Sequence, residues 1–524
     1  MTALQHGGTP KARRNQRYDG SPTMLGARLL VAVVSLLFAP SLLLPSQGDE
    51  LAAQSRRGKD LMAAGRYAEA AVVYRELVKA VPGNPGLLLD LGMALHLSGQ
   101  DQEALAPLQA AERLQPRLLP AALLLGAVNL RLGRAAAAEA PLQKAVRLQP
   151  DNREARSMLA EALVDLERYA DAEPHLRRLA QTAPSDPAAW FNLGKVYEAL
   201  AGQAFERLLK RDPESPLALA LVADARLKQD QRTAAFHLYR QAIDRAPGLR
   251  GLHGAVAAIY RRAGHPDWAA VEEERERGLP RPDCSRETLE CGFAAARHRE
   301  VVASASKLSS PEACYWLVRS YNELAVQAFA RLAALPASVE SHEWLAGIHR
   351  SERRYLESAE EWRQAMALAP RDPRLKTELA ITLRLGRDFP AARQVLEEIL
   401  RAEPDSPEAS ALLGDVLLAL EEPERAIPVL EKAVRLDEKS LPAHGALGRA
   451  YALVGRASEA IPHLRQALPA DTDGSLRYQL ARSYQAAGQA ELAGIALKDY
   501  EEFKKASSPG PEAYGQGAPI TPPR

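Results

Sequence analysis

Apolar side chains recur along most of the chain at the three- and four-residue spacing of a buried helix face. Leu88, Leu91 and Leu95 are one example, because residues three and four apart lie on one side of a helix. Short polar segments interrupt these stretches, and many contain a glycine, such as Gly65 or Gly133. Glycine ends a helix where a left-handed backbone costs little. The pattern predicts an all-α protein built from helix pairs joined by tight turns.

The helix pairs recur with a fixed period. Prolines follow one another at intervals of 34 residues, at Pro82, Pro116, Pro150 and Pro184. Such a spacing is an internal repeat. Each period also has a small residue in the first helix and another in the second, as with Gly92 and Ala104. A leucine at such a place would overpack a close helix crossing by about 1–3 kcal/mol, so the two helices of a pair are expected to cross closely there.

Taken together, these positions resemble the tetratricopeptide repeat, whose pattern is Leu-Gly or Leu-Ala, an aromatic residue, Gly, Ala and Pro. The match covers roughly residues 51–505, and later copies include Leu413-Gly414, Leu447-Gly448 and Leu480-Ala481. One helix pair cannot bury its apolar faces alone, so neighbours stack. The resemblance implies a right-handed superhelical solenoid of about a dozen helix-turn-helix units, with a concave wall of first helices as the binding surface.

Two segments break the regular pattern in the same way. Residues 196–208 (VYEALAGQAFERL) and 320–332 (SYNELAVQAFARL) are identical at eight of thirteen positions. Regular copies place the second-helix alanine nine residues after the aromatic position, whereas Tyr197 and Ala201 are only four apart. The turn between the helices is therefore missing, and the spacing predicts one long helix over Trp190–Arg211 and another near 316–335.

The likeness of the two segments indicates a duplicated block of repeats. We expect a first solenoid block over residues 49–282 and a second over 283–505, with a junction around Gly278–Glu290, where prolines and charges gather. Residues 506–524 are rich in proline and glycine, a composition that predicts a disordered tail.

The N-terminal region differs from the rest, because residues 29–44 (LLVAVVSLLFAPSLLL) are almost wholly apolar. With Arg28 before it and small residues around Gly48, residues 24–48 have the layout of a secretory signal peptide. The alternative is an uncleaved membrane anchor, since about 20 apolar residues cross a bilayer. Residues 1–23 are expected to be disordered or to precede a true start at Met24. Either way, the chain is predicted to be exported across an inner membrane, as a periplasmic or secreted protein, or held there by one span.

The balance of charges gives no indication that the protein binds nucleic acid. Lys and Arg number 67 against 66 Asp and Glu, so there is no basic excess to favour nucleic acid. The charged run 272–277 (EEERER) is expected to be a solvated helix face, with a docking patch as the alternative. Arginine is commoner than lysine, a bias that favours a bacterial source.

Three cysteines are present, and Cys284 and Cys291 are seven residues apart, unlike a CxxC metal or redox pair. In an exported chain they could form a disulfide; two unlinked thiols are the alternative. The candidate metal motif at His342 lacks the second histidine four residues on, and no phosphate-binding glycine loop occurs. We therefore expect no enzyme, metal or cofactor.

The resemblance implies a protein-protein interaction scaffold that binds protein or peptide partners in its concave groove, as in cell-envelope assembly or secretion. An enzyme or ligand-binding protein with a site built from groove side chains is one alternative, and a structural spacer is another. Some relatives clamp a partner's terminal carboxylate with lysine and asparagine four residues apart. The matching places hold other residues, namely Ser55/Lys59, Leu89/Met93, Leu123/Ala127 and Phe191/Lys195. The sequence leaves the partner-binding residues and the oligomeric state unassigned.

Overall fold

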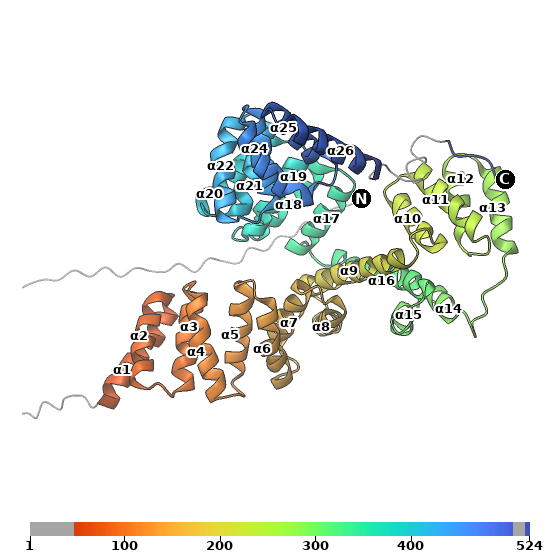
Figure 1. Ribbon diagram of the computed structural model, residues 1–524. Helices are drawn as coiled ribbons and strands as arrows, with labels where there is room; N and C mark the ends of the chain where they lie inside the picture. Colours follow the sequence, from red (N-terminus) through yellow and green to blue (C-terminus); the bar gives the residue numbers. More distant parts are fainter. Residues whose placement is uncertain (1–46, 507–518, 524) are drawn as a thin grey trace, which may run out of the picture.

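The structure is a computed structural model that describes residues 47–506 and 519–523. Every regular element in this part of the chain is a helix, which confirms the all-α prediction. The helices stack in sequence as antiparallel pairs and group into three arms that meet at two long helices (Figure 1). No described helix is long and apolar enough to span a membrane. The predicted signal or anchor, residues 24–48, lies outside the described residues except for its last two positions.

Arm 1 is the N-terminal series of four helix pairs. The turn glycines have the left-handed backbone expected of them, with φ of 72° at Gly65 and 66° at Gly133. Its helices are α1 (Gln47–Ala63), α2 (Tyr67–Ala80), α3 (Pro85–Leu97), α4 (Asp101–Leu114), α5 (Leu119–Arg131), α6 (Ala135–Leu148), α7 (Arg153–Asp165) and α8 (Tyr169–Thr182).

The small residues of each repeat lie at close helix crossings, as the sequence predicts. A Cβ atom added to Gly92 of α3 would lie 2.4 Å from the buried Leu108 of α4, and Gly126 of α5 approaches Leu142 of α6 in the same way, at 2.2 Å. Both leucines are fully buried. Because no side chain fits there, the backbone of the first helix can lie directly against the second helix of its pair.

The two long helices correspond to the two segments whose turn is missing. They are α9 (Pro187–Arg211) and α16 (Pro311–Ala333), about 37 and 35 Å long at a rise of about 1.5 Å per residue. The sequence does not predict that they pack against each other, and they do so along their length. Gly194 lies against Phe329, and the rings of Tyr197 and Tyr321 stack with centroids 6.2 Å apart. The start of α9 therefore lies beside the end of α16, so the two helices are antiparallel.

Arm 2 is the series of helices between the two long ones. It consists of α10 (Pro216–Lys228), α11 (Arg232–Arg245), α12 (Leu252–Arg262), α13 (Pro266–Gly278), α14 (Thr288–Ala294) and α15 (His298–Ala305). Its first helix, α10, contacts both α9 and α16, and its last helix, α15, packs on α16. The arm therefore leaves the long pair and returns to it as a side branch (Figure 1).

Arm 3 follows α16 and contains the last of the described helices. It consists of α17 (Val339–Ser351), α18 (Tyr355–Leu368), α19 (Pro373–Leu385), α20 (Phe389–Ala402), α21 (Pro407–Ala419), α22 (Pro423–Leu436), α23 (Leu441–Leu453), α24 (Ala457–Ala467), α25 (Ser475–Ala486) and α26 (Ala490–Ala506), with a short 3-10 turn η1 (Leu468–Ala470). Helix α17 packs against α9 as well as against α18.

This packing groups the repeats differently from the two consecutive blocks, 49–282 and 283–505, that the sequence suggests. The boundary at residue 282 falls in the connection between α13 and α14, within arm 2. The physical reason for this different grouping is that α17, the first helix of arm 3, packs against α9. Helix α9 also packs against α8, the last helix of arm 1. In space, one series runs from arm 1 through the long pair into arm 3, and arm 2 branches from it.

The predicted disordered tail needs a correction for its last part. Residues 507–518 and 524 lie outside the described residues, whereas residues 519–523 are described and contact arm 2. The Tyr260 hydroxyl donates a hydrogen bond to the Thr521 carbonyl oxygen at 2.6 Å, and Ile520 packs on the hydrophobic core.

Candidate binding grooves

A broad groove lies on arm 3 and follows its first helices. This arm 3 groove has a volume of about 1160 Å³, above the roughly 300–1,000 Å³ of a small-molecule site. Its walls come from α19, α21, α23 and α25, including Leu385, Leu412, Leu453 and Leu476. Leu385 is 39% exposed and Leu453 is 63% exposed. The groove therefore offers apolar side chains along an open channel rather than an enclosed cavity.

Three charged side chains form a ladder across this groove, one from each of three successive first helices. Asp415 of α21 accepts a hydrogen bond from Arg384 of α19 at 2.9 Å and another from Arg449 of α23 at 2.6 Å. Both arginines have an Nε atom that is buried and has no partner among the described residues. A buried donor without an acceptor costs about 1–3 kcal/mol. The ladder carries one excess positive charge, and the Arg384 and Arg449 side chains remain 32% and 39% exposed at the groove.

The small residues beside the ladder leave room above the groove floor. Gly445 and Ala446 of α23 and Ala411 of α21 line the same channel. At one end of the channel, Asp471 is buried and accepts from the backbone N–H groups of Gly474, Leu476 and Arg477. This aspartate caps the start of α25 and is fully engaged, so its role is structural.

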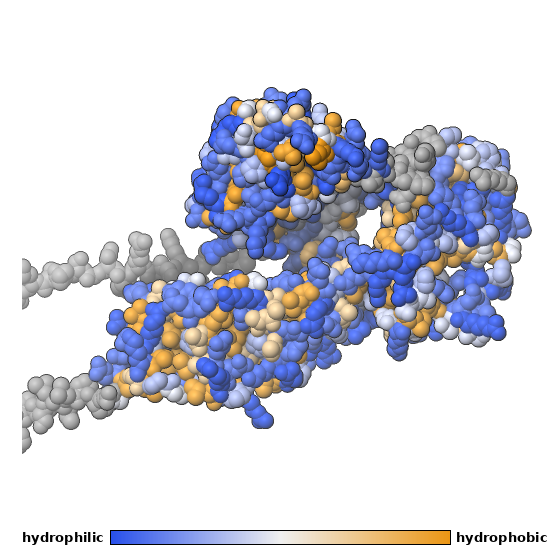
Figure 2. Space-filling view, viewed as in Figure 1, coloured by the Kyte–Doolittle hydropathy of each residue, from blue (hydrophilic) through white to orange (hydrophobic). Residues whose placement is uncertain are grey.

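Arm 1 presents a second surface, which is apolar. Its first helices carry half-buried Leu89, Met93, Leu123 and Ala127, the places where a carboxylate clamp would require lysine and asparagine. Figure 2 shows hydrophobic side chains gathered on the face of arm 1 that is turned to the viewer. Neither side chain of the clamp stands at these four places, so arm 1 lacks the charge to hold a terminal carboxylate there.

Charged residues of arm 1 and arm 3 approach one another where the two arms meet. Arg374 of α19 forms an ion pair with Glu343 of α17 at 3.7 Å. Burial raises the pKa of Glu161 on α7, Asp165 raises it further, and Arg374 opposes both effects. Because Arg374 acts on carboxylates of both arms, arms 1 and 3 are close to each other at this end.

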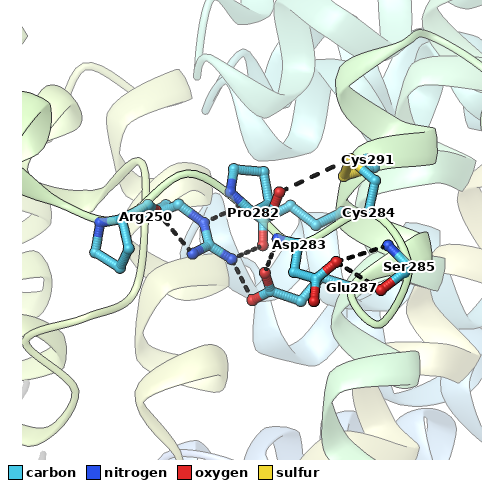
Figure 3. Close-up of a disulfide and its surroundings, with 9 residues drawn as sticks. Arg250, Pro282, Asp283, Cys284, Ser285, Glu287 and Cys291 are labelled. Carbon is cyan, nitrogen blue, oxygen red and sulfur yellow. Dashed lines mark hydrogen bonds and ion pairs between the residues drawn. A yellow bond between two sulfur atoms is a disulfide. The ribbon is translucent and has the colours of Figure 1, made fainter.

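The structure joins the candidate cysteines Cys284 and Cys291 in a disulfide, with their Cα atoms 5.6 Å apart. Arg250 also binds this part of the chain, because it donates to Glu287 at 2.5 Å (Figure 3) and to Glu290 at 2.6 Å. These two bonds hold the pKa of the Arg250 guanidinium above its usual range. The third cysteine, Cys314, is buried as a free thiol.

The charged run 272–277 differs from the expected solvated face. Glu272 is 0% exposed and contacts three cationic or imidazole groups: Arg240 at 3.1 Å, Arg275 at 2.8 Å and His253 at 2.5 Å. Glu276 accepts from the backbone N–H groups of Gly251 and Gly254 at the start of α12. The run therefore packs α13 against α11 and α12, and sequence reasoning missed this because the partners lie in other helices.

The remaining candidate motif has a structural partner. The His342 Nδ1 atom lies 2.6 Å from a Glu361 carboxylate oxygen of the next helix. Among the described residues, no group of three or more His, Cys, Asp or Glu side chains could hold a metal ion.

Comparison with known proteins identifies the repeats. Two family models described as tetratricopeptide repeat match the chain, one at residues 55–118 and 377–440, the other at residues 129–196 and 417–482. No curated protein matches the chain.

Several solved structures resemble parts of the chain. MamA from Desulfovibrio magneticus RS-1 is 19% identical, with 33% of this chain and 97% of that chain covered and a TM-score of 0.30. A thermophilic TPR protein from Thermus thermophilus is 22% identical, with 32% of this chain and 92% of that chain covered and a TM-score of 0.28. A chain of the APC/C hetero-tetramer Cut9-Hcn1 is 15% identical over 84% of this chain and 96% of that chain, with a TM-score of 0.28.

Three observations point to the same repeat: the residue pattern, the antiparallel helix pairs with glycine at their crossings, and the two matching family models. This repeat is a fold for protein interaction. The chain contains tetratricopeptide repeats, which the family models match at residues 55–118, 129–196, 377–440 and 417–482.

Proposed function

We propose that the arm 3 groove is the main site at which this interaction scaffold binds an extended segment of a partner protein. The observation that carries the proposal is the Arg384–Asp415–Arg449 ladder within an open, apolar channel. The role proposed is binding rather than catalysis, because the chemistry on offer is hydrogen-bond donors beside leucine side chains.

An extended peptide fits this combination of groups. Its backbone carbonyl oxygens would accept hydrogen bonds from the exposed parts of the Arg384 and Arg449 guanidinium groups, and a hydrogen bond to a charged group contributes about 1.5–3 kcal/mol. Its side chains would cover Leu385 and Leu453, and burying an exposed leucine contributes about 1.5–3 kcal/mol. Many moderate contacts spread along several repeats give affinity without a deep pocket.

Site-specific crosslinking in cells tests the proposal. A photoreactive residue is placed at Leu412, which lines the groove, and in a matched chain at Arg435, which is exposed on the second helix α22. We expect a specific adduct from position 412 only, lost in the double variant Arg384→Gln and Arg449→Gln while the chain stays folded. Identical adducts from both positions, or no adduct from position 412, would contradict the proposal.

We also propose that the protein works outside the cytoplasm, in the assembly or secretion machinery of a cell envelope. Two observations support this: the apolar segment 29–44 and the Cys284–Cys291 disulfide, a bond that persists in oxidising compartments. The N-terminus of the mature chain tests it. A chain that begins near Asp49 fits export without an anchor, and a membrane-bound chain that keeps residues 24–48 fits a single span. A full-length chain free in the cytoplasm would refute it.

A further inference from the structure

The last described residues of the chain lie on arm 2, although the helix that precedes them, α26, belongs to arm 3. Figure 1 places the end of the chain beside α12 and α13. The contact is specific, because the Tyr260 hydroxyl of α12 donates to the Thr521 carbonyl oxygen at 2.6 Å. Ile520 packs against the hydrophobic core to which the buried side chains of arm 2 belong. The tail is thus bound by one polar and one apolar contact.

The receiving surface on arm 2 is centred on an aromatic cluster. Tyr260 has no exposed surface and lies between Phe236 of α11 and Trp268 of α13, with each ring centroid 5.5 Å from its own. His265 stacks on Trp268 at 3.9 Å. A buried tyrosine hydroxyl needs a hydrogen-bond partner, and the tail supplies it. The tail carbonyl therefore completes a polar contact within this cluster.

The chemistry of the segment suits such a site. Residues 519–523 read Pro-Ile-Thr-Pro-Pro, and the three prolines have no backbone N–H, so this stretch favours an extended polyproline helix with about three residues per turn. Ile520 and Pro523, three residues apart, are half-buried, whereas Thr521 and Pro522 are exposed. The burial follows that period, which means that one face of the extended segment lies on arm 2.

We propose that residues 519–523 are an intramolecular ligand of arm 2, a C-terminal latch that ties arm 2 to the end of arm 3. Only residues 507–518 connect the latch to α26, and a connection of that length reaches at most about 45 Å. With the latch bound, the two arms cannot separate beyond that reach. The aromatic cluster is then a binding site for an extended, proline-containing peptide with isoleucine and proline three residues apart, and the chain fills it with its own end.

Competition between the latch and a free peptide tests the proposal. A fluorescently labelled peptide of residues 515–524 is titrated with the full chain and with a chain that ends at Ala506, and its anisotropy is recorded. A short tether gives an effective concentration of the order of 1 mM, so we expect binding to the shortened chain and at least roughly tenfold weaker binding to the full chain. Equal affinity for both chains, or no binding to the shortened chain, would overturn the proposal.

Two peptide variants separate the contacts. Ile520→Asp places a charge on the packed face and should abolish binding, whereas Thr521→Ala should bind as the original does, because the acceptor is the backbone carbonyl. In full chains carrying the same substitutions, hydrogen exchange of α12 and α13 should rise for Ile520→Asp and stay unchanged for Thr521→Ala. Loss of binding with Thr521→Ala would contradict the assigned contact. A concentration-dependent dimer that disappears on shortening would show that the segment binds a second copy, which overturns the intramolecular assignment. These experiments report on arm 2 and are independent of the arm 3 groove.

Discussion

The contact between Gly194 of α9 and Phe329 of α16 can be tested by adding one methyl group. In the variant Gly194→Ala, the new Cβ atom would lie 2.6 Å from two ring carbons of Phe329. That ring is 5% exposed and stacks on Trp344 with centroids 5.3 Å apart, so it cannot move aside into solvent. Overpacking of this kind costs about 1–3 kcal/mol, and the helix preference for alanine over glycine returns about 0.5–1 kcal/mol.

The same helix provides a matched control at Gly202. A Cβ atom there would have no heavy atom within 4 Å, and the position is exposed. Gly202→Ala therefore gains the helix preference without the clash. Because both variants share that gain, their difference in the free energy of unfolding isolates the contact with Phe329, and we expect about 1–3 kcal/mol from overpacking.

Urea unfolding of the three proteins, followed by helical circular dichroism, measures this difference. Since repeat arrays do not always unfold in one step, hydrogen exchange of peptides from α9 and α16 is measured beside it. Exchange in both helices should rise in Gly194→Ala and fall slightly in Gly202→Ala. If the two variants are equally stable, or if α16 is unaffected, then the long helices do not pack as described.

Three further predictions concern other parts of the chain. Replacing the fully buried Glu272 by Gln should destabilise arm 2 by about 3–5 kcal/mol, the cost of breaking a buried ion pair, seen as increased exchange of α11 and α13, whereas Glu274→Gln at the exposed Arg277 pair should change little. A thiol count under denaturing, non-reducing conditions should find one free thiol, Cys314, and three would exclude the bridge, which contributes about 2.5 kcal/mol in the chain-entropy model. Burial and then His444 lower the pKa of His463 below 6.5, so its stabilising effect is present above pH 6.5 and is lost as the pH falls through the lowered value. The protection factors of α24, which are corrected for the intrinsic pH dependence of exchange, should therefore fall on acidification in the native chain and much less in His463→Phe.

The features that repeat along the chain could be predicted from the sequence, because each copy reports the same local physics. Gly92, Gly126 and Gly414 all stand against a leucine of the second helix, and the constant spacing reveals that arrangement without any structure. The loss of a turn in residues 196–208 was equally visible, since it changes a spacing that the other copies keep. Such patterns predict helices and the faces they bury.

Contacts between distant parts of the chain left no periodic signal. Glu272 lies in a run that reads as a solvated charged face, and its burial depends on Arg240 and His253 of other helices. The ladder of Arg384, Asp415 and Arg449 consists of one side chain per repeat, and only stacking brings them together. The bond between Tyr260 and Thr521 joins positions 261 residues apart. No local sequence pattern links residues that lie so far apart in the chain. The candidate grooves could therefore be identified only from the structure.

The antiparallel packing of α9 and α16 explains why the turnless segment occurs twice. In a regular repeat the second helix folds back and covers the first, but a continuous helix of 25 residues cannot fold onto itself. Its first half then exposes the face of a first helix, and its second half exposes the face of a second helix. A similar helix running in the opposite direction offers the complement of both. Gly194 accordingly meets Phe329 near the far end of α16, and the Arg211 side chain at the end of α9 donates to the Ser309 carbonyl oxygen just before α16 begins. One turnless repeat alone would leave two apolar faces uncovered; two of them cover each other and create the branch from which arm 2 extends.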